Sequence, residues 1–194
     1  MDVTSKWSHF TLPWARVWRW CRFGSRNRQV NDFLFKISHR RLQIGERRIW
    51  DPGLNVSCPC GQELETQEHL FGVCHVARQV WSWFLRAWRT ATGVKVEASA
   101  KNVFFASVPP TRVRNHKKTY WRLVAIVHPE VLYSIWLSRN RWVFDEEEHS
   151  PRVVAAIARA RIHHACEAAS TLHELPGFIA LFDSLYHALE VLPG

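Results

Sequence analysis

The sequence predicts a mainly α fold, in which a small helical domain is followed by a C-terminal helical bundle or hairpin. Apolar residues recur at the 3.6-residue period of a helix over most of the chain. No alternation of strand and helix patterns is present, which argues against a parallel sheet. A chain of 194 residues that is 47% hydrophobic can also bury a core of its own.

The N-terminal part contains one short and one longer predicted helix. Residues 1–27 are rich in tryptophan and arginine, and a short helix is expected from Pro13. Apolar residues then follow a helical period over about 29–43, and Gly45 is the expected stop. The Asp51-Pro52-Gly53 sequence predicts a turn that leads into a cysteine-rich loop.

The clearest helical pattern follows this loop. Thr66 is placed to begin a helix, and an apolar stripe that includes Trp81 and Trp88 continues to about Thr92, where Gly93 should end it. Rings on such a stripe usually pack into a core. We therefore expect both tryptophans in the core and not on a binding surface.

Residues 94–118 predict mostly loop, with a short strand allowed over 103–105, because they combine Pro109-Pro110 with several basic residues. This segment is expected to link a first domain, residues 28–93, to a C-terminal helical region, residues 119–194.

The C-terminal region predicts helices in series. The apolar pattern over 120–144 contains Pro129, which should break or kink the helix into two pieces. The pair Ser150-Pro151 supplies an N-cap and a first-turn proline for an alanine-rich helix to about residue 172. A last helix should follow Pro176-Gly177.

Four of the sixteen cysteine and histidine residues lie within seventeen positions, namely Cys58, Cys60, His69 and Cys74. Their pattern, C-x-C-x8-H-x4-C, offers three thiolates and one imidazole, which is the ligand set of a closed structural zinc site. Gly61 permits the chain to fold back toward an ion. Two alternatives remain open: the group is a set of buried thiols beside a surface histidine, or His75 takes the place of His69.

The residues around this group resemble a known family. The stretch 31–42 precedes Cys-Pro-Cys-Gly, Glu65-Thr66, His69-Leu70-Phe71, Cys74 and Val80-Trp81. In order and spacing this closely resembles the zinc-binding domain that follows the polymerase in non-LTR (LINE-type) retrotransposon reverse transcriptases, over about residues 28–90. The single residue between the first two cysteines departs from the commonest form of that family. A weaker resemblance covers residues 134–144, which are similar to an Ile-Trp, Arg-Asn and Val-Phe string downstream in many such elements.

The resemblance implies a zinc-stabilised loop between two helices. It implies that the zinc ligands are Cys58, Cys60, His69 and Cys74. It also implies that the partner is RNA or DNA, with the polymerase domain of a reverse transcriptase as a second partner to consider.

Basic residues gather toward the N-terminus. The net charge of the chain is +9, and residues 1–50 contain 11 Lys and Arg against three Asp and Glu, which predicts a polyanionic partner. The candidate contacts to a nucleic-acid backbone lie beside the apolar stripe of the predicted helix and just after it: Lys36, Arg40, Arg41, Arg47 and Arg48. The alternative is a tryptophan core rimmed by arginine stems.

Catalysis is not expected. A polymerase needs grouped carboxylates to hold metal ions, and none of the five aspartates is adjacent to another. The acidic run 145–148 predicts a solvated loop, and His163-His164-Ala165-Cys166 places its side chains on different helix faces. We therefore expect a module with no enzymatic activity and no small-molecule substrate.

The sequence leaves two functions open. The first is a non-catalytic nucleic-acid-binding module, and the second is an orphan or domesticated fragment that acts as a protein-interaction scaffold. The chain shows no signal-peptide-like run and no apolar stretch of membrane-spanning length, which predicts an intracellular protein without a membrane contact and leaves nucleus and cytoplasm undistinguished. In a reducing compartment its five cysteines favour free thiols or metal ligands over disulfides.

Overall fold

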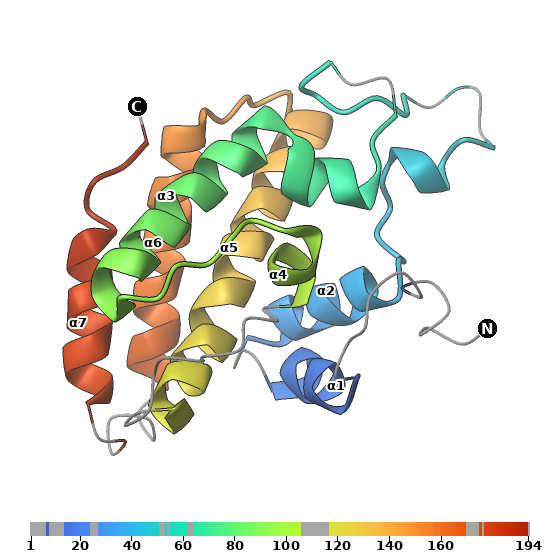
Figure 1. The fold of residues 1–194 in the computed structure, drawn as a ribbon. Coiled ribbons are helices and arrows are strands. Elements are labelled where there is room, and N and C mark those ends of the chain that lie inside the picture. The colour runs from blue at the N-terminus through green and yellow to red at the C-terminus, as the bar shows by residue number, and fades with distance from the viewer. Residues whose placement is uncertain are drawn as a thin grey trace.

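The computed structural model of the chain is helical and has no strand in the residues it describes, which confirms the predicted mainly α class (Figure 1). The described residues are 7, 14–23, 27–50, 53, 55–61, 64–105, 117–169, 175 and 177–193. In order, the elements are α1 (Trp14–Phe23), α2 (Arg28–Ser38), the 3-10 turn η2 (Gly45–Arg47), the π-helical turn η3 (His69–Val73), α3 (His75–Thr92), α4 (Ala100–Phe105), α5 (Lys117–Asp145), α6 (Pro151–Ala168) and α7 (Phe178–Ala188).

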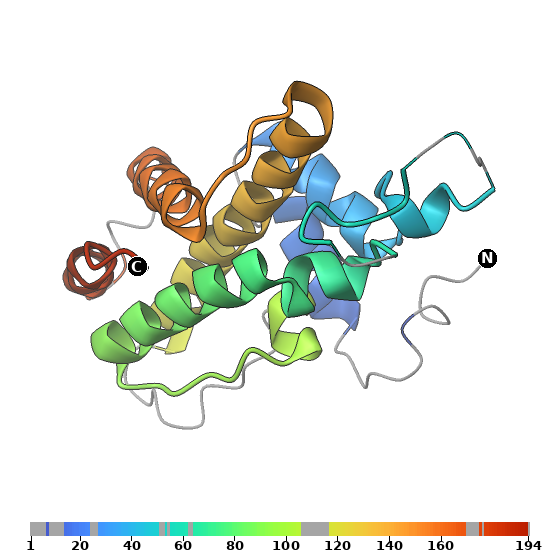
Figure 2. The same cartoon turned by 90° about the horizontal axis from the view of Figure 1, so that it is seen from above.

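The long helix α5 connects the two ends of the fold. It packs against α6 and also contacts α2, while α3 contacts both α6 and α7. Figures 1 and 2 show α1 and α2 together on one side of α5, with α6 and α7 on the other. Buried side chains from the predicted first domain and from the predicted C-terminal region form one continuous core.

Helix α2 ends five residues earlier than the expected end at residue 43. Its last turn closes with a Schellman pattern, in which the Arg40 N–H donates to Ile37 O (3.0 Å) and the Arg41 N–H to Lys36 O (2.8 Å). Arg40 takes the left-handed conformation (φ +49°) that glycine usually supplies. The expected stop at Gly45 was wrong because an arginine, held by tertiary contacts described below, ends the helix instead.

The strand allowed over 103–105 is wrong, since these residues belong to α4. The N–H of Val103 donates to the carbonyl of Ser99 (2.8 Å), which forms the first turn of a helix. Val103, Phe104 and Phe105 are all buried, and both phenylalanines contact the buried ring of Trp7. A short apolar run does not distinguish a buried helix from a strand by its periodicity. Pro109-Pro110 lies outside the described residues.

Pro129 does not divide the predicted helix, because α5 runs unbroken from Lys117 to Asp145 with the proline inside. A proline removes one backbone hydrogen bond and crowds the preceding turn. Here the residues on either side, including Val127, Val131 and Leu132, are fully buried. Tertiary burial of this kind supplies most of the stability of a helix in a protein, and it keeps α5 continuous across the proline.

The other helix predictions differ from the structure mainly at their ends. Helix α1 begins at Trp14, and Gly93 ends α3 in the left-handed region (φ +68°). Ser150 caps α6 by accepting a hydrogen bond from the Val153 N–H (3.4 Å), and α6 ends at Ala168. The expected extension over 170–172, and Asp51-Pro52 of the predicted turn, lie outside the described residues.

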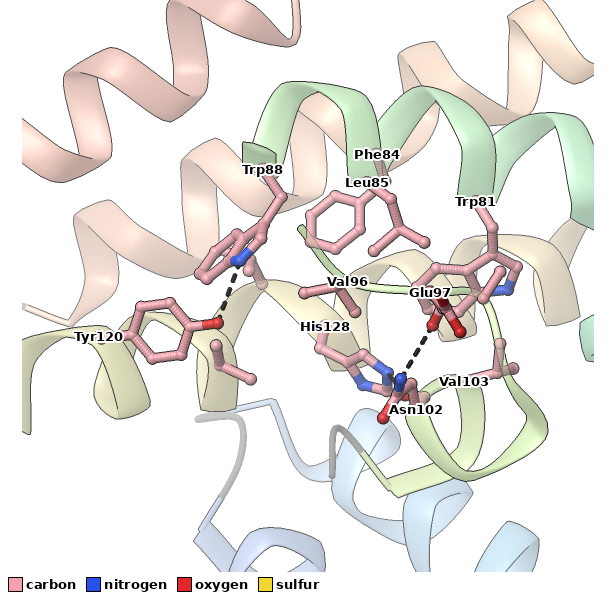
Figure 3. A pocket seen from close by; sticks show the side chains of 13 residues that line it. Trp81, Phe84, Leu85, Trp88, Val96, Glu97, Asn102, Val103, Tyr120 and His128 are labelled. Atoms are coloured by element: carbon pink, nitrogen blue, oxygen red, sulfur yellow. Dashed lines mark hydrogen bonds between the residues drawn. The ribbon is translucent and has the colours of Figure 1, made fainter. Parts of the chain in front are cut away.

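Trp81 and Trp88 are core residues, as predicted. Both are almost fully buried, and both line a small apolar cavity between α3, α4 and α5 (Figure 3). The indole N–H of Trp81 donates to Phe71 O (2.8 Å), and that of Trp88 donates to the Tyr120 hydroxyl (3.2 Å). Their polar atoms are therefore satisfied inside the protein and do not await a ligand.

Candidate metal centre

The four predicted metal ligands come together in the structure. The sulfur atoms of Cys58, Cys60 and Cys74 and a ring nitrogen of His69 all lie within 4.8 Å of one another. All the described cysteines are free thiols, so no disulfide competes for these sulfur atoms. The competing residue His75 is exposed and is not part of the cluster. The donor set, three sulfurs and one imidazole, is compatible with a closed metal site.

Local backbone structure points each of these side chains inward. The chain turns tightly after Cys58, where the Gly61 N–H donates to the Cys58 carbonyl (2.9 Å) and Gly61 has a φ of +92°. Thr66 accepts a hydrogen bond from the His69 N–H through its hydroxyl (3.0 Å), as its predicted role at a helix start requires. The His69 ring then lies with Nε2 3.0 Å from the Cys60 sulfur.

Cys74 lies at a break between two helical turns. The expected continuous helix from Thr66 is interrupted there, because Cys74 leaves helical geometry (φ −50°, ψ 137°) between η3 and α3. The break turns its sulfur toward the first backbone N–H groups of α3, and those of Val76 and Ala77 donate to it. Helix N-termini stabilise negative charge in this way.

The pKa values of Cys58 and Cys74 are shifted in opposite directions. A hydrogen bond from the Cys58 thiol, with the N–H groups of Val76 and Ala77, lowers the pKa of Cys74 to about 5 despite its burial. The same hydrogen bond, together with burial, raises the pKa of Cys58. Cys74 thus favours the thiolate, which is the form of a cysteine that binds a metal ion.

A buried ion pair that sequence analysis missed links this loop to α5. Arg139 of α5 donates two hydrogen bonds to the Glu65 carboxylate, from Nε (2.8 Å) and from a terminal nitrogen (2.5 Å). The side chains are only 5% and 1% exposed. Both residues stand in the stretches that carry the two resemblances, but nothing in a single sequence links positions 65 and 139.

The backbone at Gly45 lies very close to the backbone at Val56. Its N–H donates to the Glu65 carboxylate (3.1 Å), and a Cβ at this position would lie 1.9 Å from the carbonyl oxygen of Val56. Val56 O in turn accepts a hydrogen bond from the Glu65 N–H (2.8 Å). Gly45 is thus required by contact with Val56 and not by a helix end. Val56 begins the segment 56–74, which carries the four clustered side chains and which we call the metal loop.

We expect Gly45→Ala to destabilise the protein by about 1–3 kcal/mol, since the added methyl must displace backbone and not a flexible side chain. The control is Gly72→Ala, because a Cβ at Gly72 meets no atom within 4 Å. Urea denaturation of both variants measures the difference. Equal stability of the two variants would contradict the close approach at Gly45.

The predicted nucleic-acid contacts divide into two groups. Arg40 is engaged inside the protein: it pairs with Glu68, lies 3.9 Å from the Glu46 carboxylate, and stacks over the Trp7 ring at 4.3 Å. Lys36 is exposed and forms an ion pair with Asp32 (2.7 Å). The alternative prediction was a tryptophan core rimmed by arginine stems. Arg40 and Trp7 have that arrangement, because the arginine covers the buried ring.

The remaining three arginines have no carboxylate partner among the described residues. Arg41 and Arg47 are exposed, Arg48 is half-buried, and the guanidinium of Arg47 donates to the Arg40 carbonyl (2.8 Å). We call Arg41, Arg47 and Arg48 the basic turn, after their position around η2. The turn is fastened to the metal loop because the Glu46 N–H donates to Glu65 O (2.9 Å).

The cysteines outside the cluster lie in the core, and the acidic run lies at the surface. Cys166 faces the core, where burial raises its pKa to about 12, while its neighbour His164 is exposed. Cys21 is also a core thiol, with its pKa raised to about 11 by burial. The acidic run 145–148 is exposed, as expected.

The fold and this site define a helical protein with a Cys3His cluster of the kind that binds metal ions. Comparison of the chain with family models, with curated proteins and with solved structures gave no match. None of the helices in the described part of the chain is long and apolar enough to cross a membrane.

Proposed function

We propose that the chain is a non-catalytic, zinc-binding module that binds the backbone of RNA or DNA, like the post-polymerase region of the LINE-type reverse transcriptases that its sequence resembles. The observation that carries the proposal is the position of the basic turn. Three arginines that have no carboxylate partner among the described residues lie on a segment that is hydrogen-bonded to the loop of a metal-type cluster. Guanidinium groups without a carboxylate partner suit phosphate binding.

Zinc suits the donor set best, because three thiolates and one imidazole form its common structural site. In this proposal Cys58, Cys60, His69 and Cys74 hold the ion, and the ion supplies the cross-link that a loop with few apolar side chains lacks. Four protein ligands leave no open coordination position for water, so the role of the ion is structural.

The basic turn then acts on the nucleic-acid backbone and not on base edges. Each phosphate that an arginine neutralises releases a counterion, which makes the affinity depend on salt. Arg40 is excluded from this role because it pairs with Glu68 and Glu46. The polymerase domain of a parent element would extend the same surface.

We expect the double variant Arg41→Glu/Arg48→Glu to weaken RNA binding broadly across sequences. Loss of two phosphate contacts should flatten the slope of log affinity against log salt by about 1.4 for a single strand. Filter binding of a 20-nucleotide RNA over a salt series measures both effects.

The matched control is Arg86→Glu/Arg152→Glu, which makes the same change of charge at two exposed arginines of α3 and α6. This variant should retain most of the affinity and the slope of the parent protein. Equal losses in the two variants would show that only net charge matters. No RNA binding by the parent protein, repeated with a polymerase domain attached, would favour the protein-interaction scaffold.

A further inference from the structure

One tryptophan is neither in the core nor close to it. Trp50 is 77% exposed, at the end of the turn that follows η2. The other tryptophans whose side chains the structure describes are buried or half-buried: Trp7, Trp14, Trp18, Trp81, Trp83, Trp88, Trp121, Trp136 and Trp142. Exposing so large an apolar ring to water is unfavourable, so a bound partner gains stability by covering it.

The exposed ring is held in place. Its indole N–H donates to the carbonyl of Arg47 (2.8 Å), which closes the turn and limits rotation of the side chain. In both Figure 1 and Figure 2 this part of the chain, cyan on the colour bar, projects from the side of the helical body. A ring that is fixed before binding loses less conformational entropy when a partner stacks on it.

The charges around the ring indicate the class of partner. Arg47 and Arg48 of the basic turn lie three and two residues before Trp50 in the sequence, and the basic turn has no carboxylate partner among the described residues. A flat exposed ring beside unpaired cations suits a base whose own phosphates contact the cations. Another exposed aromatic residue, Phe144 (67% exposed), is followed by the acidic run 145–148 and offers no such setting.

We propose that Trp50 is a stacking platform for an unpaired base of a single-stranded nucleic acid whose backbone lies along the basic turn. The proposal rests on the proposed function and adds to it a preference for single strands over duplexes. In a duplex, the faces of the bases are already stacked on their neighbours and are closed to the ring. Because stacking does not involve the sugar, the platform serves single-stranded RNA and single-stranded DNA alike.

The test compares two 12-nucleotide strands, one of them with abasic sites at all internal positions, bound by the full chain and by Trp50→Ala. We expect Trp50→Ala to weaken binding of the normal strand by about 5- to 150-fold, which is the range for loss of one stacked base. Affinity for the abasic strand and the salt slope should stay unchanged, because no phosphate contact is lost. Trp50→Phe, which keeps a ring, should restore most of the affinity.

The matched control is Phe144→Ala, which removes another exposed ring, beside negative charges, and should bind both strands like the parent chain. Thermal unfolding of Trp50→Ala should match that of the parent. If the parent binds RNA with a salt slope but Trp50→Ala binds the normal strand equally well, the stacking platform is wrong and the proposed function stands. Equal weakening on both strands also overturns it, because Trp50 would then only shape the turn. Failure of the parent chain to bind either strand, both alone and with a polymerase domain attached, overturns both proposals.

Discussion

Replacing His69 with alanine, or Cys60 with serine, is expected to abolish the binding of one zinc ion per chain and to unfold the segment between Val56 and Cys74. Binding free energies of structural zinc sites in small domains are about 10–16 kcal/mol at neutral pH, which exceeds the net stability of many domains. Apart from its polar contacts, chiefly the Glu65–Arg139 ion pair, the described part of the segment has little to hold it, because Cys58, Leu70 and Phe71 are among its few buried apolar side chains.

Two measurements check this. Atomic absorption should find about one zinc in the parent protein, purified without chelator, and none in the two variants. Hydrogen exchange should show loss of protection over 56–74, while the paired helices α5 and α6 stay protected because their contact does not involve the loop.

The control is His75→Ala. This histidine is adjacent to Cys74 in sequence but exposed and outside the cluster, so its loss should leave the zinc content at one. Parent protein without zinc would contradict the site. Zinc lost from His75→Ala and kept by His69→Ala would show that the wrong histidine has been assigned.

The sequence was sufficient to predict the class of the fold and the members of the cluster. Both depend on short-range information: the helical period of apolar residues, and four ligand-type side chains within seventeen positions. Neighbours in sequence restrict one another strongly, so the loop that joins Cys58 to Cys74 needs few long-range contacts to bring the donors together.

Two of the errors share one physical cause, which is that distant contacts override local preference. Arg40 ends α2 in a conformation that normally selects glycine, because Glu68 and Trp7 hold its side chain. Pro129 lies within an unbroken helix because its neighbours are buried on both sides. In each case the deciding contact is far away in the sequence, and local patterns carry no information about it.

The same cause explains why the sequence could name the candidate contacts to a nucleic-acid backbone but could not separate Arg40 from the basic turn. All five basic residues precede the metal loop, and the sequence alone gives no reason to separate them. Only the structure shows that Arg40 pairs with the half-buried Glu46 and Glu68, whereas the basic turn has no carboxylate partner in the described part of the chain. Exposure of Trp50 was likewise missed, since an aromatic residue beside arginines predicts a core and a binding surface equally well.

Breaking the ion pair between Glu65 and Arg139 is the second change with a large expected effect. Removing one partner leaves the other charged and buried, which typically costs about 3–5 kcal/mol. We therefore expect Arg139→Leu and Glu65→Leu each to destabilise the protein by this amount in urea denaturation. The control is Arg141→Leu, which breaks an exposed pair with Glu147 (3.4 Å) and should cost about 0–1 kcal/mol.

The double variant Glu65→Leu/Arg139→Leu separates the ion pair from the rest of the network. Apolar residues in place of both charges remove the unpaired buried charge, so the double variant should be more stable than either single variant. It should still be less stable than the parent by about 1–3 kcal/mol, because the Gly45 N–H loses its carboxylate acceptor. Additive losses in the double variant would mean that the two side chains do not interact.

Arg139 should also affect zinc binding, although it belongs to α5 and is not a ligand. Through Glu65 it fixes the backbone just before Thr66, whose hydroxyl orients the turn that carries His69. Metal affinity includes the free energy needed to arrange the ligands, so a loop that is already arranged binds more tightly. In competition with a zinc chelator, Arg139→Leu should therefore release zinc at a lower chelator concentration than the parent, while Arg141→Leu should not. Unchanged zinc release from a destabilised Arg139→Leu would show instead that the metal loop is arranged independently of α5, and that the ion pair contributes to global stability alone.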